Sequence, residues 1–158
     1  MSGWGWTSKE KSVSNTNITR AEAKERSSFI SVDSYNVELD LSTRDDTFAS
    51  RTVVKFSATA GASTWIDFIA PSVTTITLNG TVLDNSAHDG FRIQLNNLAK
   101  DNVLEVVGNC AYMNTGEGLH RFIDPVDNEV YLYTQFEIAD ARRVFACFDQ
   151  PNLYAVTM

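Results

Sequence analysis

The sequence predicts a mainly β protein: an antiparallel β-sandwich or an open, curved sheet, with one short helix near the N-terminus. Segments of alternating apolar and polar side chains recur about every 8–15 residues, and turn residues separate them. β-Branched and aromatic residues are frequent in these segments, as is typical of strands. No internal repeat of the kind that forms solenoids or propellers is present.

A capping box marks the start of the predicted helix. Thr19 stands at the N-cap position and Glu22 three residues later, so each side chain can bind the other residue's backbone. Alanine and charged residues then favour helix to Ser28. Residues 1–17 are polar and rich in Ser, Thr and Asn, so we expect a flexible N-terminal arm there. We expect residues 18–158 to form one β domain.

Strand patterns follow one another along the rest of the chain. In Tyr35–Leu41 the odd positions are apolar and the even positions polar, which predicts a sheet with one face in water. Trp65–Ile69 is apolar on both faces except at Asp67, which indicates a strand covered on both sides. Asn79 and Gly80 are the clearest hairpin signal, because both residues tolerate a left-handed backbone. The other predicted strands are Thr47–Phe56, Val73–Leu78, Thr81–Leu83, Phe91–Leu95 and Val103–Val107.

Composition and charge exclude several classes of protein. The chain has 158 residues, 43% of them hydrophobic, which is an ordinary globular composition with enough residues for a core. A net charge of −7 argues against a nucleic-acid partner, which would need a basic face. No apolar run is long enough for a membrane span, and no secretory signal opens the chain. Cys110 and Cys147 are too few for a disulfide framework or a zinc site, so we expect buried, reduced thiols in a cytoplasmic protein.

The stretch Tyr131–Pro151 carries the candidate binding residues. It opens with the alternation of a strand, which places Gln135 and Glu137 on one face near the strand's end. Asp140 is expected to cap a short helix that runs to Phe145. On spacing alone, the alternative is an edge strand whose polar residues serve only solubility.

This stretch resembles the end of the N-terminal domain of the M1 family of zinc aminopeptidases, the aminopeptidase N group. That family carries Thr-Gln-x-Glu/Gln, then a basic residue or pair, then Phe-Asp-x-Pro. The preceding segment, residues 114–127, is similar to the actinobacterial aminopeptidase N type. The residues that fit the family pattern are Thr134, Gln135, Glu137, Arg142, Arg143, Phe148, Asp149 and Pro151.

The resemblance implies a saddle-shaped β domain of an enzyme that removes N-terminal residues from peptides with the help of zinc. It implies that Glu137 pairs with the free α-ammonium group of the substrate. It also implies that Gln135 lines the pocket for the first side chain of the substrate. Peptide substrates and a catalytic domain are therefore the expected partners. Arg142 and Arg143 are expected to hold local carboxylates such as Asp140 or Asp149, or to face the next domain.

The chemistry of a zinc peptidase is missing from this sequence. Such an enzyme needs two histidines one helical turn apart and a glutamate that acts as base. The chain has only His88 and His120, and no HExxH motif. We therefore expect no catalytic residue and no bound zinc in this chain, which would be inactive alone, with the catalytic domain following Met158. The alternative is a stand-alone β-sandwich binding or adaptor module.

Overall fold

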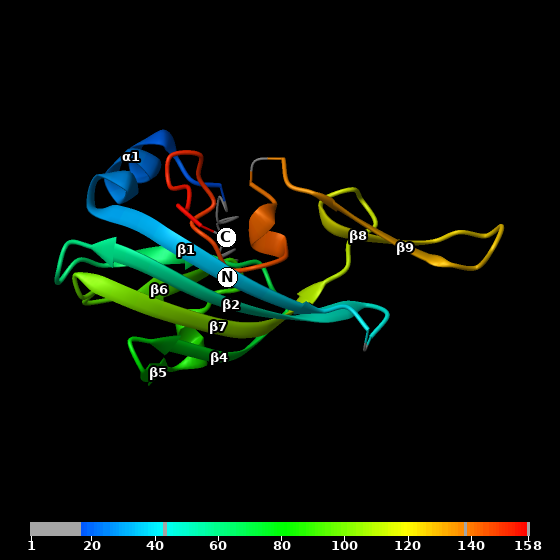
Figure 1. Cartoon of the computed structure of the whole chain (residues 1–158), viewed down its shortest axis with the longest axis horizontal. Coiled ribbons are helices and arrows are strands. Elements are labelled where there is room, and N and C mark those ends of the chain that lie inside the picture. The colour runs from blue at the N-terminus through cyan, green and yellow to red at the C-terminus, as the bar shows by residue number, and fades with distance from the viewer. Residues whose placement is uncertain (1–16, 43, 138, 158) are drawn as a thin grey trace, which may run out of the picture.

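The computed structural model describes residues 17–42, 44–137 and 139–157. The predicted arm, residues 1–17, therefore lies outside the described residues except for Asn17. Among the described residues, helix α1 (Arg20–Phe29) is the first element, and strands make up most of the rest (Figure 1). The strands are β1 (Ile30–Asp40), β2 (Thr47–Ala58), β3 (Thr64–Asp67), β4 (Ser72–Leu78), β5 (Thr81–Leu83), β6 (Arg92–Leu95), β7 (Asp101–Ala111), β8 (Gly118–Ile123) and β9 (Val130–Gln135). Two 3-10 helices, η1 (Asn85–Ala87) and η2 (Ala141–Arg143), complete the elements of the described ranges.

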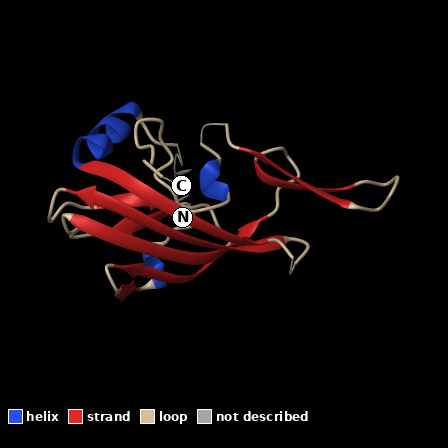
Figure 2. Cartoon of the chain, viewed as in Figure 1, coloured by secondary structure: helices blue, strands red, loops and turns tan. Residues whose placement is uncertain are grey.

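The strands form open antiparallel sheets, which confirms the mainly β prediction. Five strands make the largest sheet, in the order β1-β2-β7-β4-β5, and β3 pairs with β6 in a small second sheet. β8 and β9 form a separate hairpin that projects from one end of the molecule (Figure 2). None of the helices in the described ranges has the length and apolar character of a membrane span.

The predicted helix start and the predicted hairpin are both confirmed. The Thr19 hydroxyl accepts the Glu22 amide at 3.2 Å, and the Glu22 carboxylate accepts the Thr19 amide at 2.7 Å. At the turn between β4 and β5, Asn79 and Gly80 have φ values of 51° and 81°. These left-handed conformations match the twist of the paired strands, so the two-residue turn fixes their register.

One face of the large sheet is packed into the core. Along β2 the side chains alternate strictly, with Phe48, Val54 and Phe56 among those that point inward. The segment that follows η2 crosses this inner face. Its Val144 carbonyl accepts the Ser50 hydroxyl at 2.8 Å. Because the segment is buried against the sheet, it acts as part of the core and carries the chain from the hairpin to the C-terminal end.

A buried charge stands in β3, where the sequence indicated a covered strand. Asp67 and Arg26 form an ion pair of 3.0 Å with side chains only 2% and 1% exposed. Arg26 also donates from Nε to the Gln150 side chain at 2.5 Å, and the Gln150 amide donates to the Ala23 carbonyl of α1 at 3.0 Å. The backbones of Asp67 and Cys147 exchange hydrogen bonds of 2.9 and 3.0 Å. Helix α1, strand β3 and the C-terminal segment are therefore joined at one buried carboxylate.

Both cysteines are free and buried, as predicted. Burial raises the pKa of Cys110 to about 12. Burial, aided by the charges of Asp149 and Asp67, raises the pKa of Cys147 well above that of an ordinary thiol. A thiol reacts as the thiolate, so both groups are inert in the folded protein.

We predict that replacing Asp67 by asparagine strongly destabilises the fold. Removing one partner of a buried ion pair leaves the other charge uncompensated, which costs about 3–5 kcal/mol in the free energy of unfolding. Urea unfolding measures this loss. The control is Glu38→Gln, because Glu38 pairs with Arg51 on the exposed side of the sheet and such pairs contribute about 0–1 kcal/mol. Equal losses of unfolding free energy for the two variants would show that the ion pair of Asp67 contributes no more than an exposed pair.

We also predict that neither thiol reacts with a colorimetric disulfide reagent at pH 8 in the folded protein. Two thiols are expected to react once denaturant is added, since unfolding removes the burial that raises both pKa values. Rapid reaction of either cysteine before unfolding would show that its side chain is accessible.

Candidate functional site

The projecting hairpin carries the residues that the sequence singled out. β8 and β9 pair along their whole length, from Gly118 opposite Gln135 to Ile123 opposite Val130. All six residues of β9 are exposed, so this strand has no buried face. His120 stacks on the ring of Tyr133 at a centroid distance of 4.5 Å and thereby stiffens the pair. The hairpin is an exposed but hydrogen-bonded platform.

Gln135 and Glu137 lie where β9 ends. Gln135 is the last residue of the strand, so the strand ends two residues before the predicted alternation does. Glu137 follows in the connection to η2, and both residues are exposed. No hydrogen bond or ion pair within the described ranges takes up the side chain of either residue. The carboxylate of Glu137 is therefore available to a cation from outside this part of the chain.

The side chains that alternate with these two residues, Thr134 and Phe136, contact a different surface. Thr134 and Phe136 line a groove of about 410 Å³ between the hairpin and β1, where Val37 and Leu39 form the opposite wall. Neither Gln135 nor Glu137 lines this groove. The alternation of the chain thus separates Thr134 and Phe136, which face the groove, from Gln135 and Glu137, which stay in solvent.

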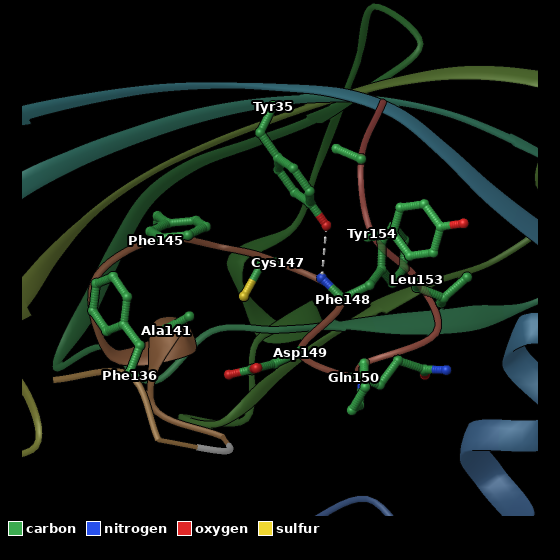
Figure 3. Close-up of a pocket in the computed structure, with 12 residues that line it drawn as sticks. Tyr35, Phe136, Ala141, Phe145, Cys147, Phe148, Asp149, Gln150, Leu153 and Tyr154 are labelled. Carbon is green, nitrogen blue, oxygen red and sulfur yellow. Dashed lines mark hydrogen bonds between the residues drawn. The ribbon is translucent and has the colours of Figure 1, made fainter. Parts of the chain in front are cut away.

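A second groove, of about 420 Å³, lies beside the first and is mainly apolar (Figure 3). Phe136 and Phe145 lie close together at one end of it, and Tyr154 lies in its opposite part. The Tyr35 hydroxyl accepts the Phe148 amide at 3.0 Å, and burial raises the pKa of this hydroxyl. Tyr35 therefore stays protonated and serves as a structural hydrogen-bond partner in the groove.

The connection after β9 differs from the prediction. The Asp140 side chain makes no capping hydrogen bond, and the helix is a single 3-10 turn that ends at Arg143, before Phe145. Asp140 has φ −117° and ψ −6°, whereas a capping residue needs an extended backbone to turn its side chain back. Its carboxylate instead accepts Arg143 Nε at 2.8 Å. The predicted cap is therefore wrong.

The two adjacent arginines, Arg142 and Arg143, bind different partners. Arg143 pairs with Asp140 and, at 3.1 Å, with Glu117, which confirms that it holds local carboxylates. Arg142 is buried and donates from Nε to the Ala139 carbonyl and from Nη2 to Asn17, each at 2.8 Å. Sequence spacing did not distinguish these roles, because both arginines lie within three residues of Asp140.

The described residues do not fit a zinc site. Within them, no group of three or more His, Cys, Asp or Glu side chains could hold a metal ion. His88 Nε2 lies 2.9 Å from the Phe68 carbonyl oxygen, and His120 Nδ1 accepts the Gly116 amide at 3.1 Å. Each histidine is thus already bound within its own neighbourhood.

Comparison with known proteins relates the sequence of this chain to aminopeptidase N. No protein-family model matches the chain. Over 145 residues, which are 89% of the chain, it is 52% identical to aminopeptidase N of Streptomyces lividans. The chain spans 17% of the length of that relative.

Solved structures with the same fold belong to larger metallopeptidases and related hydrolases. Leukotriene A4 hydrolase of Saccharomyces cerevisiae matches 95% of the chain with a TM-score of 0.67 and 15% identity, over 25% of its own length. An M1 zinc metallopeptidase variant of Deinococcus radiodurans matches 82% with a TM-score of 0.61 and 15% identity, over 31% of its length. Aminopeptidase A of Legionella pneumophila matches 81% with a TM-score of 0.65 and 15% identity, over 15% of its length. The chain is therefore a homologue of aminopeptidase N, with the fold of the N-terminal region of M1 metallopeptidases.

Proposed function

We propose that this chain is the N-terminal β domain of a zinc-dependent aminopeptidase, and that it recognises the free N-terminus of peptide substrates. The observation that carries the proposal is the exposed pair Gln135 and Glu137 at the end of the projecting hairpin, in a homologue of aminopeptidase N. The domain itself is not catalytic. Zinc and the residues that activate water belong to another part of the longer protein, since the described residues do not fit a metal site.

The role of Glu137 follows from the charge of the substrate. A peptide with a free N-terminus presents an α-ammonium group, and a carboxylate held close to it forms a strong, charge-assisted hydrogen bond. A blocked N-terminus or an internal peptide bond offers no such cation, so its binding would leave the carboxylate of Glu137 without a partner. An unpaired Glu137 is what this selection requires, and its carboxylate has no partner within the described ranges.

Gln135 would form part of the wall for the first side chain of the substrate. Its amide both donates and accepts hydrogen bonds and carries no charge that would compete with Glu137 for the ammonium group. The pairing of Gln135 with Gly118 fixes the backbone from which this amide projects. The two residues therefore have separate roles, since Glu137 binds the cation and Gln135 contacts what lies next to it.

The apolar surface of the hairpin supports a role within a larger protein. Several large hydrophobic side chains are about half exposed there, and contiguous apolar surface of this kind marks an interaction site. We infer that the catalytic domain covers it, in a cytoplasmic enzyme whose buried thiols remain reduced. The exposed residues are Phe122, Ile123, Val130, Tyr131, Leu132, Tyr133 and Phe136.

We predict that Glu137→Ala lowers kcat/KM of the intact enzyme for an aminoacyl-anilide by well over tenfold. Loss of a desolvated ammonium partner typically costs about 2–5 kcal/mol. The matched control is Glu129→Ala, because Glu129 is an exposed glutamate at the far end of the same hairpin. Unchanged kinetics of the Glu137 variant, or an equal loss in the Glu129 variant, would remove the assignment.

We also predict that the 158-residue chain, purified alone, neither cleaves an aminoacyl-anilide nor binds zinc stoichiometrically. Elemental analysis after dialysis measures the metal, and a continuous absorbance assay measures the activity. Cleavage by the highly purified chain would refute a non-catalytic domain. If the gene were found to encode no catalytic domain, a stand-alone binding module would be favoured instead.

A further inference from the structure

Arg143 connects the two segments that flank the end of β9. From η2 its Nε donates to Asp140 Oδ1 at 2.8 Å, and its Nη2 lies 3.1 Å from Glu117 Oε2. Asp140 follows Glu137 by three residues, whereas Glu117 immediately precedes β8. One guanidinium group therefore links the beginning of β8 to the chain that leaves β9.

The stem of Arg143 also packs directly on the hairpin. Gly118 pairs with Gln135 and has a left-handed φ of 64°. A Cβ atom added to Gly118 would lie 2.9 Å from Arg143 Cβ, which is too close for any side chain. The absence of a side chain at Gly118 thus lets Arg143 lie against the backbone opposite Gln135.

The same short segment is held from the core side by Arg142. This arginine is buried, and its Nε donates to the carbonyl of Ala139, two residues after Glu137. Its Nη1 lies 4.0 Å from Asp67 Oδ1, at the buried charge cluster. Arg142 therefore holds the segment after β9 against the core, and Arg143 holds it against the hairpin.

We propose that Arg143 is a positioning residue, which fixes through Asp140 and Glu117 the direction in which Glu137 leaves the hairpin. This inference rests on the proposed function, because it needs Glu137 to bind the ammonium group of the substrate. Without the guanidinium, the two carboxylates would face each other unpaired and repel, so the connection would move away from the hairpin. A displacement of about 1 Å is enough to weaken binding and catalysis by a factor of about 10 to 100.

The test is a double-mutant cycle in the intact enzyme. We expect Arg143→Met to lower kcat/KM for an aminoacyl-anilide about tenfold or more. In the Glu137→Ala background the same change is expected to alter kcat/KM by less than about twofold, since residues that act through one another are not additive. We expect Arg143→Lys to recover activity only in part, because a single ammonium group cannot bridge both carboxylates as the fork of arginine does.

Arg51→Met provides a control with the same chemistry. Arg51 also bridges two carboxylates, Glu38 at 2.9 Å and Glu105 at 3.0 Å, but it lies on the large sheet. This variant is expected to keep the kcat/KM of the unmodified enzyme. If Arg143→Met does not fold, Glu117→Gln removes one arm of the same bridge and takes its place in the cycle.

The outcomes separate the two proposals. If Glu137→Ala leaves kcat/KM unchanged, the proposed function fails, and the positioning role fails with it. If Glu137→Ala has its large effect but the change at Arg143 has none, the positioning role alone is overturned. It is also overturned if the effects of the two changes multiply, since Arg143 would then act independently of Glu137.

Discussion

The buried pairing of Asp67 with Arg26 is the interaction on which the arrangement of this domain depends. Two charges with side chains no more than 2% exposed survive in the core only because each compensates the other. Two further arginines compensate the charge of Asp67, since Arg92 lies 3.7 Å and Arg142 4.0 Å from its other carboxylate oxygen. The pair binds three parts of the chain that no continuous sheet connects: helix α1, strand β3 and the C-terminal segment.

From this charge cluster a series of polar contacts leads outward to the hairpin. Arg142 belongs to the cluster and binds the backbone at Ala139, and the adjacent Arg143 binds Asp140 and Glu117. Strand β9 has no buried face of its own, so the contacts of Arg142 and Arg143 add to those that β8 makes through the buried Leu119 and the ion pair of Arg121 with Asp45. These contacts explain how an exposed strand can present polar side chains in a defined direction, which is the requirement for recognising a small charged group.

Local sequence signals were sufficient for the helix start, for most of the strands and for the exposure of the candidate pair, but not for strand β8 or the 3-10 helix η1. The capping box at Thr19, the turn at Asn79 and the alternation along β2 depend on neighbouring residues, and all three are confirmed. The buried charge cluster could not be predicted, because the partner of Asp67 lies 41 residues away and is known only once the fold is formed. The bridge of Arg143 to Glu117 was missed for the same reason. Asp140, three residues before Arg143, was assigned a cap that its backbone does not permit.

The central claim is that Glu137 binds the free N-terminus of a peptide. A crystal structure of the intact enzyme with a bound, uncleaved peptide analogue tests it most directly, through the distance between the α-amino nitrogen and the Glu137 carboxylate. The account predicts about 2.7–2.9 Å, the length of a charge-assisted hydrogen bond. An α-amino group bound by other residues, with Glu137 beyond about 6 Å and facing solvent, would contradict it.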